Sequence, residues 1–149
     1  MRYALVLLLA GQLLGCTEDI GTDIRATSLP ATVDLHVGQS IKVHEDGSTI
    51  TFRKVTEDSR CPIGFICFWA GDAGAEIAIR QFQSSAKNCT LHTTLDPKIV
   101  EVGRISVRLK HLVPYPRSDA EINPMEYVAT LEIDWARERV TGSRFPYLN

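Results

Sequence analysis

The fold class is decided by one stretch of the sequence, Ile105-Ser106-Val107-Arg108-Leu109-Lys110. Its apolar side chains stand at every second position, and polar side chains fill the positions between them. Because successive side chains of a strand point to opposite faces, this pattern predicts a strand with one buried face and one solvated face. A helix would need apolar residues at intervals of three and four, and this stretch does not have them.

The same alternation recurs along the chain in segments 33–37, 41–43, 50–55, 75–79 and 127–135. Two weaker segments, 89–95 and 98–102, are separated by the turn signal Asp96-Pro97. Short strands with frequent turns are typical of an antiparallel β-sandwich or a partly open barrel, here of about seven or eight strands. We expect a single all-β domain over residues 33–135, followed by a C-terminal tail over residues 136–149.

Length and charge limit the classes of function. The chain has 149 residues, which allow one ordinary domain and exclude a large multidomain enzyme. It carries 16 Lys and Arg against 18 Asp and Glu, a net charge of −2, and it has no basic run. Nucleic-acid binding proteins need a concentration of positive charge, so we expect no nucleic-acid partner.

The first fifteen residues predict a secretory signal peptide. A positive start is followed by the apolar run Ala4–Ala10 and then by Leu13-Leu14-Gly15-Cys16. A membrane-spanning helix needs about 20 apolar residues, and this segment is shorter. Its proportions match those of a signal peptide that is removed after export.

Leu13-Leu14-Gly15-Cys16 resembles the lipobox of bacterial lipoproteins. The resemblance implies cleavage before Cys16 and lipid on its thiol, so that the membrane is a partner through this residue. Thr17 follows the cysteine where an aspartate would favour the inner membrane, which implies an outer-membrane protein facing the periplasm. We expect residues 16–32, which contain few large apolar side chains, to form a flexible tether.

Cys61 and Cys67 are predicted to form a disulfide. An exported protein reaches a compartment in which disulfides persist. The five residues between the two cysteines include Pro62 and Gly64, which can turn the chain back on itself. A bond between Cys67 and Cys89 remains an alternative, and the role of Cys89 stays open.

The segment around these cysteines resembles a signature of small, largely uncharacterised bacterial envelope lipoproteins and secreted proteins. The motif consists of Asp58-Ser59-Arg60-Cys61-Pro62, then Cys67, then Trp69-Ala70-Gly71, and the similarity extends over about Val33 to Ile133. This resemblance implies an all-β exported domain with a cross-linked loop. It implies no activity.

Four residues of the loop form a candidate binding surface: Asp58, Arg60, Trp69 and Asp72. Functional side chains are concentrated on loops held by a rigid scaffold, which supports a binding surface. The interpretation that we place first is a structural loop, in which Arg60 pairs with an acid and Trp69 packs on the disulfide and covers the core.

The chain contains none of the common catalytic or phosphate-binding motifs, so we predict no catalytic residues and no cofactor. Cys89-Thr90-Leu91-His92 has metal-like spacing, but two ligands are weak support, and we predict no metal. We therefore expect a lipid-anchored envelope protein that is a non-catalytic binding or structural module, with a protein or small envelope component as its ligand. The alternative is a secreted enzyme or enzyme inhibitor whose site lies on the loop Cys61–Asp72.

Overall fold

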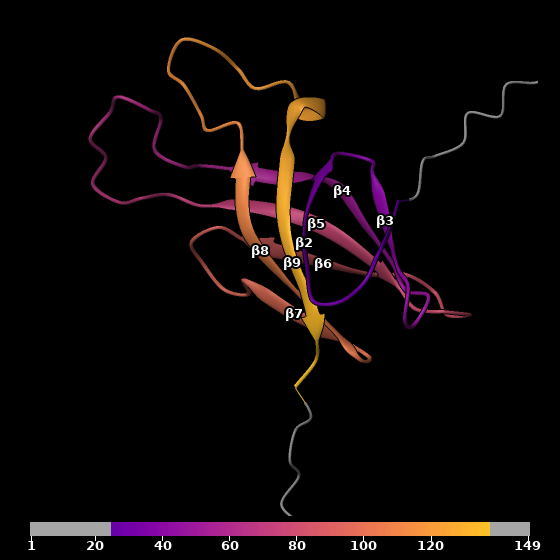
Figure 1. The fold of residues 1–149 in the computed structure, drawn as a ribbon. Coiled ribbons are helices and arrows are strands. Elements are labelled where there is room, and N and C mark those ends of the chain that lie inside the picture. The colour runs from indigo at the N-terminus through magenta and orange to yellow at the C-terminus, as the bar shows by residue number, and fades with distance from the viewer. Residues whose placement is uncertain (1–24, 138–149) are drawn as a thin grey trace, which may run out of the picture.

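Two β-sheets pack face to face in the computed structural model, which describes residues 25–137 (Figure 1). The strands are β1 (Arg25–Thr27), β2 (Ala31–His36), β3 (Ser40–Val43), β4 (Thr49–Asp58), β5 (Ala73–Arg80), β6 (Lys87–His92), β7 (Ile99–Val102), β8 (Ile105–Val113) and β9 (Val128–Trp135). A short 3-10 turn, η1 (Pro124–Glu126), precedes β9. One sheet has the order β1-β3-β4-β5-β6 and the other the order β2-β9-β8-β7.

The predicted fold class is confirmed, because the chain forms an all-β sandwich of two open sheets. Nine strands are present in the described residues, against the predicted seven or eight. The additional strand is β1, which pairs in parallel with β3, whereas every other strand pairing is antiparallel.

The described residues begin at Arg25, inside the range predicted to be a tether, and β1 lies in that range. β1 forms because its backbone pairs with β3. A strand of three residues is too short to show an apolar alternation, so the sequence did not predict it. The predicted signal peptide, the lipid site at Cys16 and most of the C-terminal tail lie outside the described residues. Within residues 25–137, no helix is long and apolar enough to cross a membrane.

The core lies between the two sheets and is built from the alternating apolar positions. Phe52 of β4 and Ile77 of β5 face it from one sheet, and Val107 of β8 and Leu131 of β9 face it from the other. All four side chains are fully buried. Burying each such side chain contributes about 1.5–3 kcal/mol, so this inner layer is the main source of stability.

Four strand ends meet at one end of the sandwich. β4 ends and β5 begins there in one sheet, while β8 ends and β9 begins there in the other. The β4–β5 loop, in magenta, and the β8–β9 loop, in orange, both project from this end (Figure 1). They are in direct contact, because the amide of Ile63 donates a hydrogen bond of 2.9 Å to the carbonyl of Pro116.

Candidate functional site

The β4–β5 loop, residues 59–72, continues the β-hairpin beyond the ends of its strands. The amide of Ser59 donates to the carbonyl of Asp72 at 2.7 Å, and the amide of Cys61 donates to the carbonyl of Ala70 at 3.1 Å. A disulfide joins Cys61 to Cys67 and closes the outer part of the loop, as predicted. Cys89 is the free cysteine of the described residues, so the alternative bond between Cys67 and Cys89 is absent.

At the start of the loop, Asp58 and Arg60 form a buried ion pair. Arg60 donates through Nε to Asp58 Oδ1 at 2.8 Å and through Nη2 to Asp58 Oδ2 at 2.6 Å. The exposed fraction of the side chain is 3% for Arg60 and 9% for Asp58. Two parallel hydrogen bonds give the pair a fixed orientation, which matters most where water is excluded.

This ion pair also joins the two sheets. Arg60 donates to the carbonyls of Leu112 and Pro114 at 2.5 and 2.8 Å, both at the end of β8. The hydroxyl of Tyr127, next to the start of β9, donates to Asp58 Oδ2 at 2.9 Å. Leu112 lies in the sheet opposite β4, and Pro114 and Tyr127 adjoin its strands, so the pair holds the base of the loop against both sheets.

The surroundings of the pair shift two pKa values in opposite directions. Burial by itself raises the pKa of Asp58, but hydrogen bonds from Arg60 and Tyr127 and the charge of Arg60 hold it below its usual value. Burial, the hydrogen bond to Asp58 and the negative charge of Asp58 raise the pKa of Tyr127 to about 12. At neutral pH, Asp58 is therefore ionised and Tyr127 is a neutral donor.

At the other end of the loop, Asp72 organises the turn after β6. Its carboxylate accepts hydrogen bonds from Thr93 Oγ1 at 3.1 Å, the Thr94 amide at 2.7 Å and the Leu95 amide at 3.2 Å, and it contacts His92 Nδ1 at 2.5 Å. Burial raises the pKa of Asp72, but these hydrogen bonds outweigh it and lower the pKa to about 2.

The four residues predicted to form a binding surface do not lie on one surface. Arg60 and Asp72 are buried, with exposed fractions of 4% and 6%, and Asp58 is in contact with Arg60 below the surface. Trp69 is 73% exposed. The expectation that Trp69 covers the core is wrong, because its ring packs edge-on against Phe68 in the loop instead. Of the four, Trp69 alone is open to a partner.

The exposed part of the loop carries large apolar side chains that the sequence analysis did not single out. We name this group the loop tip; it comprises Ile63 (64% exposed), Phe65 (60%), Ile66 (103%), Phe68 (97%) and Trp69 (73%). No residue from Cys61 to Gly71 is charged. Monomeric proteins rarely expose so much contiguous apolar surface unless the surface binds something.

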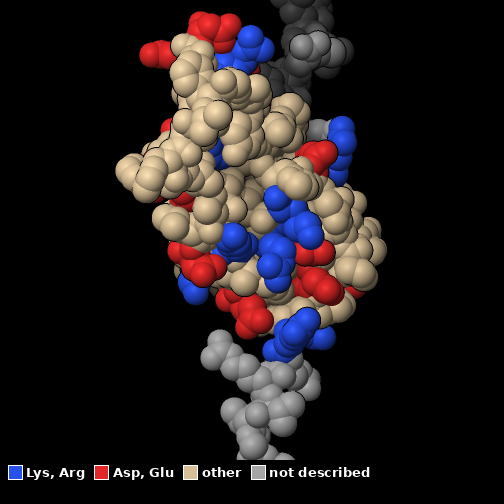
Figure 2. All heavy atoms as spheres, turned by 90° about the vertical axis from the view of Figure 1, so that its left-hand side faces the viewer, with Lys and Arg blue, Asp and Glu red and all other residues tan. Residues whose placement is uncertain are grey.

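The surface around the loop tip is poor in charge. Figure 2 shows the face of the molecule from which the loops project, and its upper part is largely uncharged except for a small charged group at the top. Lys, Arg, Asp and Glu are interspersed over the lower part of the same face. Ile66 and Phe68 are almost fully exposed, which distinguishes the loop tip from the core. In the sequence, the one signal for the loop tip is that residues 61–71 carry no charge and show no strand-like alternation.

Three side chains of the types that bind metals lie together beside the base of the loop. Glu57, Asp72 and His92 each bring one ligand atom within 4.8 Å of the others. Both oxygens of Asp72 already accept hydrogen bonds, so a cation would have to displace a donor such as His92. Cys89 and His92 cannot act as a pair of ligands, because they lie on opposite faces of β6.

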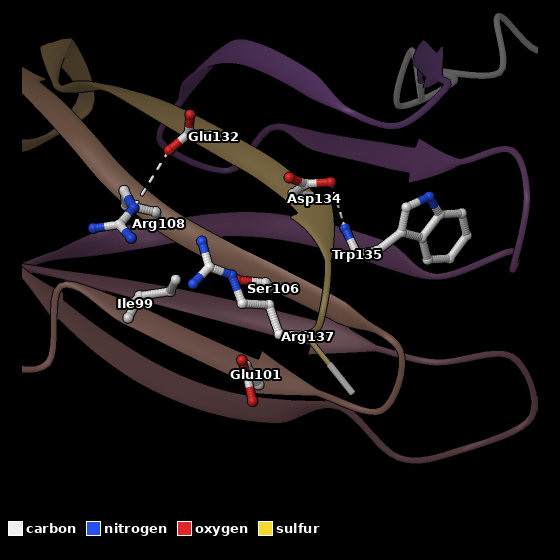
Figure 3. A pocket seen from close by; sticks show the side chains of 8 residues that line it. All are labelled: Ile99, Glu101, Ser106, Arg108, Glu132, Asp134, Trp135 and Arg137. Carbon is white, nitrogen blue, oxygen red and sulfur yellow. Dashed lines mark hydrogen bonds and ion pairs between the residues drawn. The ribbon is translucent and has the colours of Figure 1, made fainter. Parts of the chain in front are cut away.

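A shallow depression of about 360 Å³ lies on the outer face of β7, β8 and β9 (Figure 3). Arg108 and Lys110 both contact Glu132, at 3.3 and 3.6 Å, and Arg137 extends over Ser106 toward Arg108. Exposed pairs of this kind are common on solvated sheet faces and contribute little energy. We therefore do not place the functional site there.

The loop offers apolar surface rather than reacting groups. The titratable side chains at its base, Asp58, Arg60 and Asp72, are occupied by hydrogen bonds that hold the loop in place. Comparisons with family models, with curated proteins and with solved structures find no match to this chain. The geometry of the loop is that of a rigidly held apolar projection.

Proposed function

We propose that this protein is a non-catalytic binding module that engages its ligand through the loop tip. One observation carries the proposal: large apolar side chains are exposed on a loop whose base is fixed by two buried carboxylates and whose outer part is closed by a disulfide. A loop held in this way loses little conformational entropy when it binds, so the exposed area contributes more fully to affinity.

We further propose that the module is anchored by lipid on Cys16 to the outer membrane and faces the periplasm. The lipobox-like Leu13-Leu14-Gly15-Cys16 and the following Thr17 support this location. The intact Cys61–Cys67 disulfide agrees with an oxidising compartment. Mass spectrometry of the mature protein tests the anchor: we expect an N-terminal Cys16 that carries lipid, and an unmodified Cys16 would contradict it.

Crosslinking in living cells tests the binding site. Phe68 in the loop tip is replaced by p-benzoylphenylalanine, and a matched variant carries the same group in place of Phe82. Phe82 is also well exposed but lies in the β5–β6 loop, at the opposite end of the sheet. We expect light-dependent adducts from position 68 and few or none from position 82.

The proposal fails if the two positions give the same adducts, or if neither position gives an adduct with protein or with lipid. Equal labelling would mean that exposure alone, rather than the loop tip, determines contact. The amount of each variant is measured by blotting without reduction. Equal amounts show that a missing adduct is not caused by loss of the protein.

An enzyme inhibitor is a second candidate function, since a disulfide-closed projecting loop has a suitable shape to enter an enzyme cleft. It would use the same loop tip. A crosslinked enzyme whose activity falls when the purified protein is added, and recovers with the Phe68→Asp variant, would favour this function.

A further inference from the structure

We infer that the loop tip inserts into the interfacial region of a neutral phospholipid bilayer. This inference rests on the proposed function and names the ligand of the same site. It follows from the distribution of apolar surface, the backbone hydrogen bonds of the loop and the charge of the residues around it.

The loop tip has no polar side. Ile63, Phe65, Ile66, Phe68 and Trp69 are all well exposed, and the segment 61–71 contains no charged side chain. A protein groove normally covers one face of a bound segment, and the remaining face stays polar and solvated. A loop that is apolar all round is instead suited to a phase that surrounds it, as the acyl boundary of a bilayer does.

Part of the loop backbone is already hydrogen-bonded within the protein. Unsatisfied amide and carbonyl groups are costly in hydrocarbon, and they are tolerated only where water or headgroups can reach them. Within the loop, the Cys61 amide donates to Ala70 and the Phe65 amide donates to Pro62, while the Ile63 amide donates to Pro116 of the neighbouring loop. These internal bonds lower the cost of moving residues 61–65 out of water, while the outer residues 66–69 would keep partners in the hydrated headgroup layer.

The loop combines the residue types that a membrane interface favours. The purely apolar Ile66 and Phe68 are the most exposed, and the amphipathic Trp69 and Tyr115 lie beside them with smaller exposed fractions. Tyr115 packs on Arg60 at the base of the loop, with 4.4 Å between its ring centre and the guanidinium carbon. Tryptophan and tyrosine are enriched at the boundary between acyl chains and headgroups.

Acidic residues at the same end of the molecule select for neutral headgroups. Glu57, Glu121 and Glu126 are exposed there, and the basic Arg117 is paired with Asp119 at 3.0 Å. An anionic surface attracts basic segments and repels acidic ones, with an effect that salt screens. We therefore expect the protein to prefer a zwitterionic bilayer to an anionic one.

The test uses the chain from Thr17 to Asn149, which contains every strand of the described fold and lacks the lipid site. A Trp135→Phe variant leaves Trp69 as the sole tryptophan. Phosphatidylcholine vesicles are added, and binding is followed by sedimentation and by Trp69 fluorescence. We expect a shift of the emission to shorter wavelength and quenching by acyl chains that carry bromine.

Substitutions identify the inserting residues. Ile66→Asp and Phe68→Asp should each weaken vesicle binding at least about tenfold, because each removes an apolar side chain from the inserted surface and adds a charge. Phe82→Asp, which changes the same residue type at the other end of the sheet, should leave binding unchanged. Thermal unfolding is measured for each variant, and equal midpoints show that the fold is retained.

Each outcome decides between ligands. Binding that is lost with Phe68→Asp, kept with Phe82→Asp and weakened by phosphatidylglycerol at low salt supports the inference. Absence of vesicle binding overturns it, as does equal binding by all variants. Stronger binding to anionic than to neutral vesicles overturns the selection of neutral headgroups.

The crosslinking experiment separates this inference from the proposed function. If vesicles are not bound but protein crosslinks from position 68 persist in cells, the proposed function stands with a protein ligand. If vesicle binding and crosslinking both fail, neither proposal holds.

Discussion

Asp58 connects three parts of the molecule that are distant in sequence. It pairs with Arg60 at the start of the loop and accepts a hydrogen bond from Tyr127, which is 69 residues further along the chain. Removing one member of a buried ion pair leaves the other charge without a partner in a poorly solvated place. The stability of this end of the sandwich therefore depends on single side chains.

We expect Asp58→Ala to lower the free energy of unfolding by about 3–5 kcal/mol, the cost typical of breaking a buried ion pair. Asp119→Ala serves as the matched control, because Asp119 pairs with Arg117 at the surface, where both side chains are 65% exposed. That change should have little effect, because solvent screens an exposed pair. Urea unfolding measures both, and equal losses would show that burial of the Asp58–Arg60 pair is unimportant.

The other carboxylate, Asp72, gives stability a dependence on acid. Its folded-state pKa of about 2 lies below the ordinary value of 3.8, so the ionised group contributes stability above about pH 4. That contribution is lost as the pH falls from about 4 to about 2. Asp72→Asn should therefore be less stable than the wild type at pH 7, and the difference should shrink over this acid range. Unfolding curves across that range measure the effect; a constant difference would argue against it.

At the scale of elements, the hairpin of β4 and β5 extends into the loop because the chain can approach itself closely at Gly71. A Cβ atom there would lie 1.9 Å from the carbonyl oxygen of Ser59, and the backbone φ of Gly71 is +69°. Both facts require glycine at this position. The close approach allows the hydrogen bonds between Ser59 and Asp72 to form at the base of the loop.

Gly71→Ala is expected to destabilise the protein by about 3 kcal/mol or more, since it combines an unfavourable φ with a clash against backbone. Gly64 is a matched control: its φ is +86°, but a Cβ there would meet no atom within 4 Å. Gly64→Ala should cost about 1–2 kcal/mol from the φ alone. Thermal and urea unfolding compare the two, and an equal effect would remove the clash as the cause.

At the scale of the whole molecule, apolar side chains serve two separate purposes. One set lies between the sheets and holds them together, and the other set lies at the loop tip and takes no part in the core. Phe52 and Phe68 illustrate the division, since Phe52 is fully buried in β4 and Phe68 is almost fully exposed.

Phe52→Ala should lower the free energy of unfolding by about 3–5 kcal/mol, because it leaves a cavity between the sheets. Phe68→Ala should change it by no more than about 0.5 kcal/mol, as is usual for exposed sites. The same Phe68→Ala variant should nevertheless weaken binding to phosphatidylcholine vesicles. If Phe68→Ala destabilised the fold as much as Phe52→Ala, the loop tip would be part of the core.

Local patterns in the sequence were sufficient to predict the strands and the fold class. Alternation in segments such as 105–110 and 127–135 depends on the two-residue period of an extended chain, which is the same wherever the strand lies. The Cys61–Cys67 pairing was also predictable, because two cysteines so close in sequence need only a local turn to meet. Strand β1 was missed because its pairing with β3 leaves no side-chain pattern.

The tertiary structure alone decided which loop residues are buried and which are exposed. Asp58, Arg60 and Asp72 were candidates either for a binding surface or for structural pairing, and contacts with Leu112, Tyr127 and the turn after β6 decide for burial. Trp69, expected in the structural interpretation to cover the core, lies outside it, and its apolar neighbours at the loop tip were not singled out at all. Sequence determines which side chains could be buried, but burial itself depends on contacts between residues far apart in the chain, and these exist only once the two sheets have packed.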